Sequence, residues 1–425
     1  MAVVVIGGGW AGCSAAIAAS KAGARVTLLE RTDMLLGAGL SGGIMRNNGR
    51  YTATEEAIAM GAGDLFAVTD RYSRHTGIEF PGHRHASLYD IARIEPAVRK
   101  AVEGAGVGIL TQRRIISVKV DSGSIVSVST ADGETWAAGA FVDATGSSGP
   151  MGSCMKNGNG CAMCMFRCPS FGPRQGISRL AGARETALQG QRPAPGVFSG
   201  SCDLMKGSLS EEIVSKLDRY GAVVVPLPPE LVNASKLSSK ACQQYALPEF
   251  AENLILLDNG CVKLMTPYMP IETLRQIPGF EYARYAEPLS GGKGNSIRYV
   301  AIAARDSTLR VDGLANLFCC GEKSGPYVGH TEAIVTGALA GRNAAATAAG
   351  LQPLELSRNT AIGDFIAIAG DESRDTGGFA RTLTFAGASF FERMKQRGLY
   401  TIDKQAIRQR VRQDGLEGIF ERPVT

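Results

Sequence analysis

The sequence lacks a long uninterrupted apolar segment. None of its hydrophobic runs approaches the ~20 residues that a membrane-spanning helix needs, and the first apolar run is short and β-branched, with no charged segment before it. We therefore expect a cytoplasmic protein without a membrane-embedded part. Disulfides are rare in that compartment, so disulfide stapling by the 10 cysteines is not expected.

Strong net charge and internal repeats are also missing. The formal net charge of +5 is mild and does not by itself indicate a nucleic-acid partner. One segment departs from this balance, because seven Lys or Arg residues and a single acid, Asp403, lie between Arg393 and Arg412. We interpret it as a solvated basic helix, and a nucleic-acid or partner surface is the alternative.

Glycine, in contrast, is abundant. The chain has 53 glycines in 425 residues, well above the roughly 7% of average proteins. They cluster in tight turns rather than in low-complexity tracts, which indicates places where backbone must come close to another group. The length exceeds that of one compact core and predicts two or three domains.

The most informative turn lies at the N-terminus. A β-branched run, residues 3–6, leads into a Gly-x-Gly-x-x-Gly turn made by Gly7, Gly9 and Gly12, and an Ala-rich helical segment follows. A second strand then ends at Glu30, where a carboxylate can accept hydrogen bonds from a ribose. Strand, glycine turn, helix, strand and acid in this order predict a dinucleotide-binding unit, with the pyrophosphate at the helix N-terminus.

Two later segments favour FAD over NAD. A strand ends in Ala144-Thr145-Gly146, a turn that resembles those of flavoprotein families, and a second strand ends at Gly321-Glu322 before a helical run, residues 331–346. A helix N-terminus stabilises the negative charge of reduced flavin. The full set of expected cofactor-binding residues is Gly7, Gly9, Gly12, Glu30, Arg31, Gly42, Gly43, Ala144, Thr145, Gly146, Gly321, Glu322, Thr331 and Glu332.

We expect an α/β fold with three parts. A two-part Rossmann-like FAD-binding domain comprises residues 1–150 and 297–350. A mixed α+β insertion, residues 151–296, carries the substrate site and a cysteine cluster, and residues 351–425 form a helical C-terminal segment. Residues 51–104 are expected to contain helices and loops.

Four of the cysteines lie close together in the sequence. Cys154, Cys161, Cys164 and Cys168 can converge on one metal centre, and Pro169 after the last of them is typical of ferredoxin-type ligation. We favour a [4Fe–4S] cluster, which can exchange single electrons with a flavin. A structural zinc site and a catalytic dithiol are the alternatives, because four thiolates alone do not select the metal.

Two signatures resemble those of the tRNA-uridine-modifying FAD flavoproteins, which include the folate- and FAD-dependent tRNA uracil methyltransferase and the carboxymethylaminomethyluridine-forming flavoprotein. The signatures are residues 275–283, which include Ile277-Pro278-Gly279, and residues 327–344, which end in Gly341-Arg342-Asn343-Ala344. The resemblance implies a two-part FAD-binding fold and a folate-type substrate or an RNA partner. The loop after the second strand has Asn47 and Asn48 but lacks the catalytic cysteine of the methyltransferase.

The candidate catalytic residues come from two loops. Asn47 and Asn48 are expected near the flavin, and Lys293 and Arg298, in a glycine-rich segment, can pair with an anionic substrate tail. A plain surface loop is the alternative for the second pair. His330 either faces the flavin or caps a helix.

We conclude from the sequence that the chain is an FAD-dependent oxidoreductase with a [4Fe–4S] cluster. Its expected partners are a small anionic substrate, for which a reduced folate is a candidate, and a protein electron donor. A folate- and FAD-dependent RNA methyltransferase and a non-catalytic folate- or flavin-binding helper are the alternatives. Binding of RNA and assembly into a homo-oligomer stay open.

Overall fold

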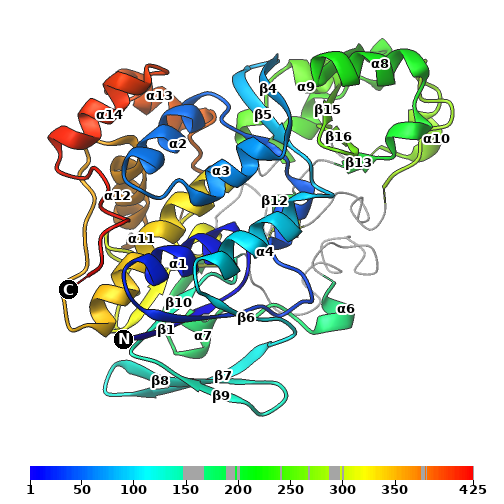
Figure 1. Ribbon diagram of the computed structural model, residues 1–425. Coiled ribbons are helices and arrows are strands. Elements are labelled where there is room, and N and C mark those ends of the chain that lie inside the picture. Colours follow the sequence, from blue (N-terminus) through cyan, green and yellow to red (C-terminus); the bar gives the residue numbers. More distant parts are fainter. Residues whose placement is uncertain are drawn as a thin grey trace.

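The structure is a computed structural model, shown in Figure 1. It describes residues 1–146, 167–187, 197–198, 202–239, 242–266, 269–286, 297–298, 301–374, 379 and 381–424.

A five-stranded parallel sheet forms the centre of the molecule, in the order β19-β10-β1-β2-β6. Its strands are β1 (Ala2–Ile6), β2 (Arg25–Leu29), β6 (Gly108–Leu110), β10 (Ala140–Asp143) and β19 (Leu317–Cys319). The strands are short and rich in Val, Leu and Ile because both faces of such a sheet are covered. The expected Rossmann-like α/β core is therefore confirmed.

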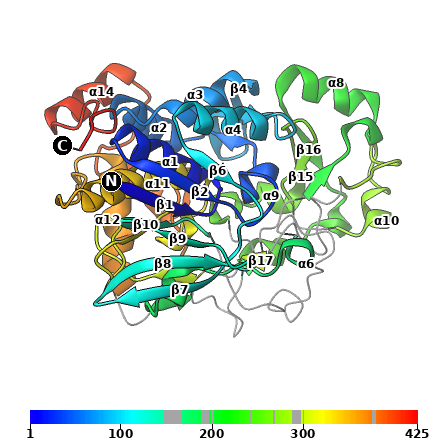
Figure 2. The same ribbon diagram turned by 60° about the horizontal axis from the view of Figure 1, so that its bottom comes forward.

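Alternate residues of β1 belong to different layers. Val3 and Val5 pack under the helices on one face, whereas Val4 and Ile6 pack against a β-meander on the other. The meander consists of β7 (Ile115–Asp121), β8 (Ser124–Thr130) and β9 (Thr135–Ala137) and lies below the sheet in Figure 2.

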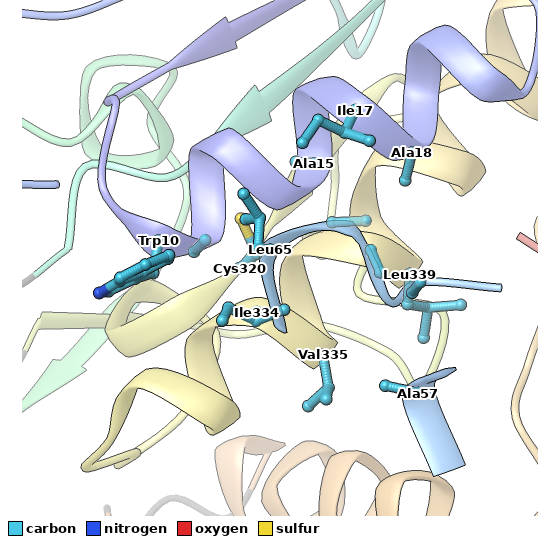
Figure 3. Close-up of a cluster of buried hydrophobic side chains, with 14 of the residues drawn as sticks. Trp10, Ala15, Ile17, Ala18, Ala57, Leu65, Cys320, Ile334, Val335 and Leu339 are labelled. Atoms are coloured by element: carbon cyan, nitrogen blue, oxygen red, sulfur yellow. The ribbon is translucent and has the colours of Figure 1, made fainter. Parts of the chain in front are cut away.

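Two helices pack closely on the first face. These are α1 (Trp10–Lys21) and α11 (His330–Ala348), whose shared core is drawn in Figure 3. The close contact between α1 and α11 depends on glycine, because a Cβ at Gly337 would lie 2.2 Å from the carbonyl oxygen of Ala11. A Cβ at Gly341 would lie 2.0 Å from that of Ala15. The small residues of both helices thus let α11 lie against the first helix of the fold.

The region between β2 and β6 holds more than the helices and loops expected there. Its helices are α2 (Gly49–Ala59), α3 (Asp64–Arg71) and α4 (Ile94–Gly104), and its strands are β3 (Ile44–Met45), β4 (Ser73–Phe80) and β5 (His83–Tyr89). The β4–β5 hairpin was not expected from the sequence. Strand β4 is half exposed and has large apolar side chains only at Ile78 and Phe80, so it gives no sustained alternating apolar pattern.

The insertion contains a four-stranded antiparallel sheet, in the order β13-β16-β15-β14. Its strands are β13 (Cys202–Leu204), β14 (Ala222–Pro226), β15 (Asn253–Asp258) and β16 (Val262–Leu264). Helix α8 (Glu211–Tyr220) begins at Ser210, whose side chain accepts a hydrogen bond from the backbone of Ile213, and ends at Gly221 with φ 74°.

Several short elements connect these parts. They are α6 (Cys168–Phe171), α7 (Ile177–Leu180), α9 (Glu249–Glu252), α10 (Ile271–Leu274), β11 (Glu185–Ala187) paired with β18 (Ala301–Ala303), and β12 (Val197–Phe198) paired with β17 (Ile297–Arg298). The 3-10 helices are η1 (Gly37–Ser41), η2 (Lys206–Ser208), η3 (Pro229–Leu231), η4 (Ala234–Ser239), η5 (Gln243–Tyr245) and η6 (Gly321–Lys323).

The C-terminal region is helical, as expected, with α12 (Ala361–Arg374), α13 (Ala388–Gln396) and α14 (Lys404–Gln413). The basic segment, Arg393 to Arg412, runs from the last turn of α13 through most of α14, and Asp403 caps α14. Arg408 and Arg412 both pair with Glu417, so part of its charge is balanced within the chain. Within the described part of the chain, no helix has the length and hydropathy to cross a membrane.

Candidate functional site

A large cavity lies where the strands of the central sheet end, and the insertion forms its opposite wall. Its volume is about 250 Å³. The last residue of β1 and the turns after β1, β2 and β10 contribute one side, whereas Lys263, Met265 and η5 contribute the other. In open α/β sheets the carboxyl ends of the strands are where ligands bind.

The glycine turn forms one part of the wall. Gly7 has φ +102°, and a Cβ at Gly12 would lie 1.8 Å from the carbonyl oxygen of Gly7, so both positions need glycine for the chain's own packing. Gly9 differs, because a Cβ there would meet no atom within 4 Å, and Gly9 lines the cavity. Its exposed backbone and the N-terminus of α1 are suited to hold a pyrophosphate.

Glu30 lies beside this turn and also lines the cavity. Its carboxylate accepts hydrogen bonds from the backbone N–H of Gly8 (2.6 Å) and of Thr32 (2.8 Å), which fixes both oxygens. Arg31 follows, and burial lowers the pKa of its guanidinium. This end of the cavity also holds Arg114, so it combines one carboxylate with cationic groups.

Most of the other expected cofactor-binding residues line the same cavity. Those residues are Gly42, Ala144, Thr145, Gly146, Gly321 and Glu322. Their turns are held by side chains behind them: Asp143 accepts from the Thr145 hydroxyl (2.6 Å), and the Thr336 hydroxyl accepts from the backbone of Gly321 (2.9 Å). Segments that lie far apart in the sequence are thus brought together at one site.

Thr331, Glu332 and Gly43 do not contribute to the cavity wall. Glu332 is fully buried and forms an ion pair with Arg50, while its Oε1 accepts hydrogen bonds from Thr384 and the backbone of Phe385. This carboxylate therefore fixes the first turn of α11 against its neighbours. Cofactor binding by these three residues stays a prediction.

The two asparagines also lie behind the wall rather than on it. Asn47 is fully buried, and its Nδ2 lies 2.9 Å from Nδ1 of His83. Asn48 donates to the carbonyl oxygens of Gly82 and Ala386. A catalytic role for either asparagine stays a prediction, since both side chains are engaged in fixing the backbone.

His330 does line the cavity. Its ring lies against Gly42, where a Cβ would come within 1.7 Å of the imidazole, and its Nδ1 is 3.1 Å from the hydroxyl of Tyr89. That hydroxyl donates to the carbonyl oxygen of Gly39 (2.6 Å), so it accepts from Nδ1 and the Nδ1 proton is fixed. His330 is therefore on the cavity wall at the start of α11.

Several wall residues had no sequence signal. Gln244, Tyr245 and Lys263 come from the insertion, and their neighbours follow no recognisable motif. Trp10 also lines the cavity, and for this residue a sequence signal existed, because it lies between Gly9 and Gly12 of the glycine turn. Long-range packing alone brings the insertion residues to the site.

The remaining predicted site residues cannot be placed. Lys293, Cys154, Cys161 and Cys164 lie outside the described residues, and for Arg298 only the backbone, in β17, is described. Cys168 is half-buried at the start of α6. Among the described residues there is no group of three or more His, Cys, Asp or Glu side chains placed to hold a metal ion.

Comparisons with known proteins agree with this geometry. Residues 2–149 match the family described as FAD dependent oxidoreductase, and residues 248–352 match the family described as glucose inhibited division protein A.

Two solved structures of GidA from Aquifex aeolicus share the fold. The form II crystal structure has a TM-score of 0.72 and 20% identity, over 97% of this chain and 73% of that chain. The form I structure has a TM-score of 0.65 and 17% identity, over 97% and 78%.

The cavity wall fits FAD. The bare backbone at Gly9 and the carboxylate of Glu30 suit a pyrophosphate and a ribose, and the N-terminus of α11 suits an electron-rich ring.

Proposed function

We propose that this chain, an FAD flavoprotein of the superfamily that includes the tRNA-uridine-modifying flavoproteins, is an oxidoreductase acting on a small anionic substrate, with a reduced folate as the first candidate. The superfamily resemblance predicted from the sequence signatures is confirmed. The substrate and the direction of electron transfer are the proposal.

One observation carries the proposal. A single cavity is lined by the glycine turn and Glu30 and also by His330 at the start of α11 and by Lys263 of the insertion. FAD, when bound, supplies hydride or single-electron chemistry. The protein's part is to hold the phosphates at Gly9, to place positive helix ends and a cation near the ring, and to close the cavity with the insertion.

Lys263 supports an anionic substrate. The side chain is 6% exposed, and its Nζ donates to the carbonyl oxygen of Ser41 at 2.5 Å. An ammonium group has three protons, so this hydrogen bond leaves donors for a carboxylate or carbonyl oxygen in the cavity. A buried cation in a binding cavity favours ligands of negative charge.

A [4Fe–4S] cluster at Cys154, Cys161, Cys164 and Cys168 is the second part of the proposal. It is supported by the spacing of the cysteines and by the position of Cys168, which follows Arg167 on the cavity wall. A cluster near that wall would exchange electrons with the flavin and with a protein electron donor.

The first experiment is the absorption spectrum of anaerobically purified protein, with iron, acid-labile sulfide and zinc measured against FAD. We expect about four iron and four sulfide per flavin, lost in Cys161→Ala and Cys164→Ala. Cys261→Ala is the matched control, because this half-buried cysteine lies outside the segment, and it should retain the iron. Flavin with zinc, or without metal, would exclude the cluster, and protein without flavin would exclude the oxidoreductase.

The substrate class is tested by mixing the FAD-loaded protein with tetrahydrofolate under anaerobic conditions. Loss of the oxidised flavin absorbance, dependent on folate concentration and weakened in Lys263→Met, supports the proposal. No change with folate, together with RNA binding that falls steeply with salt, would favour the methyltransferase alternative instead.

A further inference from the structure

We propose that Asp203 is a positioning residue that keeps a proton on its carboxyl group, so that the positive charge of the neighbouring Lys263 stays uncompensated and the cavity wall favours an anionic ligand. The inference rests on the proposed function and deepens it, because it explains how this wall selects negative charge. Three features of the structure carry it: the placement of the two side chains, the hydrogen bonds of the carboxyl group, and the titratable groups around it.

Asp203 and Lys263 are neighbours on two adjacent strands of the insertion. They stand directly opposite each other in the antiparallel pair of β13 and β16, an arrangement in which the two Cβ atoms are about 4.5–5.5 Å apart. The next residues along these strands, Leu204 and Leu264, belong to the insertion's own core, and side chains alternate between the faces of a sheet. Asp203 and Lys263 therefore share the opposite face, on which Lys263 reaches the cavity wall.

The carboxyl group of Asp203 has too few hydrogen-bond donors around it for an ionised group. The residue is fully buried, and its Oδ1 accepts a hydrogen bond from Nδ2 of Asn259 (3.1 Å). Its Oδ2 has no hydrogen-bond partner within the described part of the chain, and neither has Oδ1 of the same Asn259 amide. A proton on Oδ2 removes the charge and turns this oxygen from an acceptor into a donor, which resolves the excess of acceptors.

The titratable groups around Asp203 agree with a protonated carboxyl. Burial raises the pKa of Asp203, and the charge of Lys263 offsets only part of this effect. Tyr89, Cys202 and Cys261 also interact electrostatically with Asp203, and burial raises the pKa of each, that of Cys202 to about 12. These three groups are neutral at neutral pH. Of the described groups that interact with Asp203, Lys263 is therefore the one that carries charge.

The proton on Asp203 decides the charge of this part of the wall. Lys263 donates to the carbonyl oxygen of Ser41 (2.5 Å), which is neutral, so with Asp203 protonated the ammonium keeps its full charge in the cavity. An ionised Asp203 directly behind it would cancel most of that charge, and the wall would no longer favour an anion. Reduced flavin is anionic, so the redox potential of bound FAD reports on this charge.

The first test is the infrared absorption of protonated carboxylic acids in FAD-loaded protein without substrate. At neutral pH we expect Asp203→Asn to lose a band that wild type shows. Asp218→Asn is the matched control, because Asp218 is an exposed acid of the same insertion, and it should keep the band. Labelling the aspartates with a heavy carbon isotope should shift the band in wild type, so its assignment to an aspartate does not depend on whether a variant folds.

The second test is the redox potential of the bound flavin. At neutral pH the potential of Asp203→Asn should equal that of wild type, because a neutral amide replaces a neutral acid. Lys263→Met should lower the potential, since it removes a positive charge that stabilises anionic reduced flavin. When the pH is raised until Asp203 ionises, the potential of wild type should fall below that of Asp203→Asn, a difference that a purely structural role would not produce.

Three outcomes overturn the assignment. One is a wild-type spectrum in which no carboxylic acid band responds to the isotope label. Another is a potential of Asp203→Asn above that of wild type at neutral pH, because the carboxyl would then be ionised. The third is an unchanged potential in Lys263→Met, because its charge would then not act in the cavity. Thermal unfolding and FAD content of each variant are recorded. Neither test uses folate, so a failure here is distinct from a failure of folate to reduce the flavin, and wild type without FAD would refute the proposed function itself.

Discussion

Arg50 and Glu332 form a buried ion pair between α2 and α11. Nε of Arg50 lies 3.1 Å from each carboxylate oxygen, and the side chains are 3% and 0% exposed. Burial by itself would lower the pKa of Arg50, but the Glu332 carboxylate outweighs it and holds the pKa above its usual value. The pair ties the first turn of α11, on which His330 stands, to Asn47, because Arg50 also donates a hydrogen bond to Oδ1 of Asn47 (3.0 Å).

We predict that Glu332→Ala destabilises the protein by about 3–5 kcal/mol, because it leaves the Arg50 charge buried and unpaired. The double variant Arg50→Met/Glu332→Leu should recover much of the loss, since it removes both charges. Urea unfolding measures both effects. Lys216→Ala, which breaks an exposed pair with Glu212, is the control and should leave the midpoint unchanged. Equal effects of Glu332→Ala and the control would contradict a role for the buried pair.

A second prediction concerns Gly9 and Gly12, because the two positions require glycine for different reasons. Gly12→Ala should lower the melting temperature even without FAD, since the added Cβ would clash with the carbonyl oxygen of Gly7. Gly9→Ala should leave the melting temperature of the FAD-free protein unchanged but weaken FAD binding, because its Cβ meets no protein atom. Calorimetry of the apo forms measures the effect on stability, and FAD titration measures the effect on cofactor binding. Unchanged FAD affinity in Gly9→Ala would place the pyrophosphate elsewhere.

The nucleotide-binding half of the fold was predictable because its signals are local. The glycine turn, Glu30 and the Ala144-Thr145-Gly146 turn each follow a short apolar strand, and parallel strands end at one edge of their sheet. The helix at residues 331–346 was also recognisable, and the structure extends it to His330–Ala348.

The insertion side of the site was not predictable from the sequence. Gln244 lies in a single 3-10 turn, and its carbonyl oxygen accepts a hydrogen bond from His83, 161 residues earlier. The sequence predicts Glu332 as a cofactor-binding residue from its position at the start of a helix, yet its partner Arg50 is 282 residues away. Single-sequence patterns report local periodicity, so they do not reveal which buried polar groups satisfy each other across the fold.

Glu56 gives a pH prediction. Its carboxylate accepts hydrogen bonds from the backbone of Ala361 (2.9 Å) and Ile362 (3.0 Å) at the start of α12, and burial raises its pKa to about 7. Between pH 4.5 and 7 the folded state keeps a proton that the unfolded state releases, so this residue makes stability fall as pH rises, by about 1.4 kcal/mol per unit.

The measurement is the free energy of unfolding of wild type and Glu56→Gln at several pH values in that window. The variant cannot titrate, so its stability relative to wild type should improve as pH rises. A difference that does not depend on pH would mean that Glu56 is ionised throughout.

His83 has the opposite pH dependence. Burial lowers the pKa of its imidazole to about 3, so the folded ring stays neutral while an unfolded histidine gains a proton below pH 6.5. The contribution of His83 to stability is therefore complete above pH 6.5 and is lost as pH falls towards 3, by about 1.4 kcal/mol per unit. We expect wild type to lose stability faster than His83→Asn on acidification. In NMR spectra of the folded protein, the His83 ring signals should not move between pH 8 and 5, whereas those of the exposed ring of an unfolded chain would. A titration of His83 near pH 6 would break the hydrogen bond from Asn47, since a protonated Nδ1 cannot accept, and would show that burial does not keep the folded ring neutral.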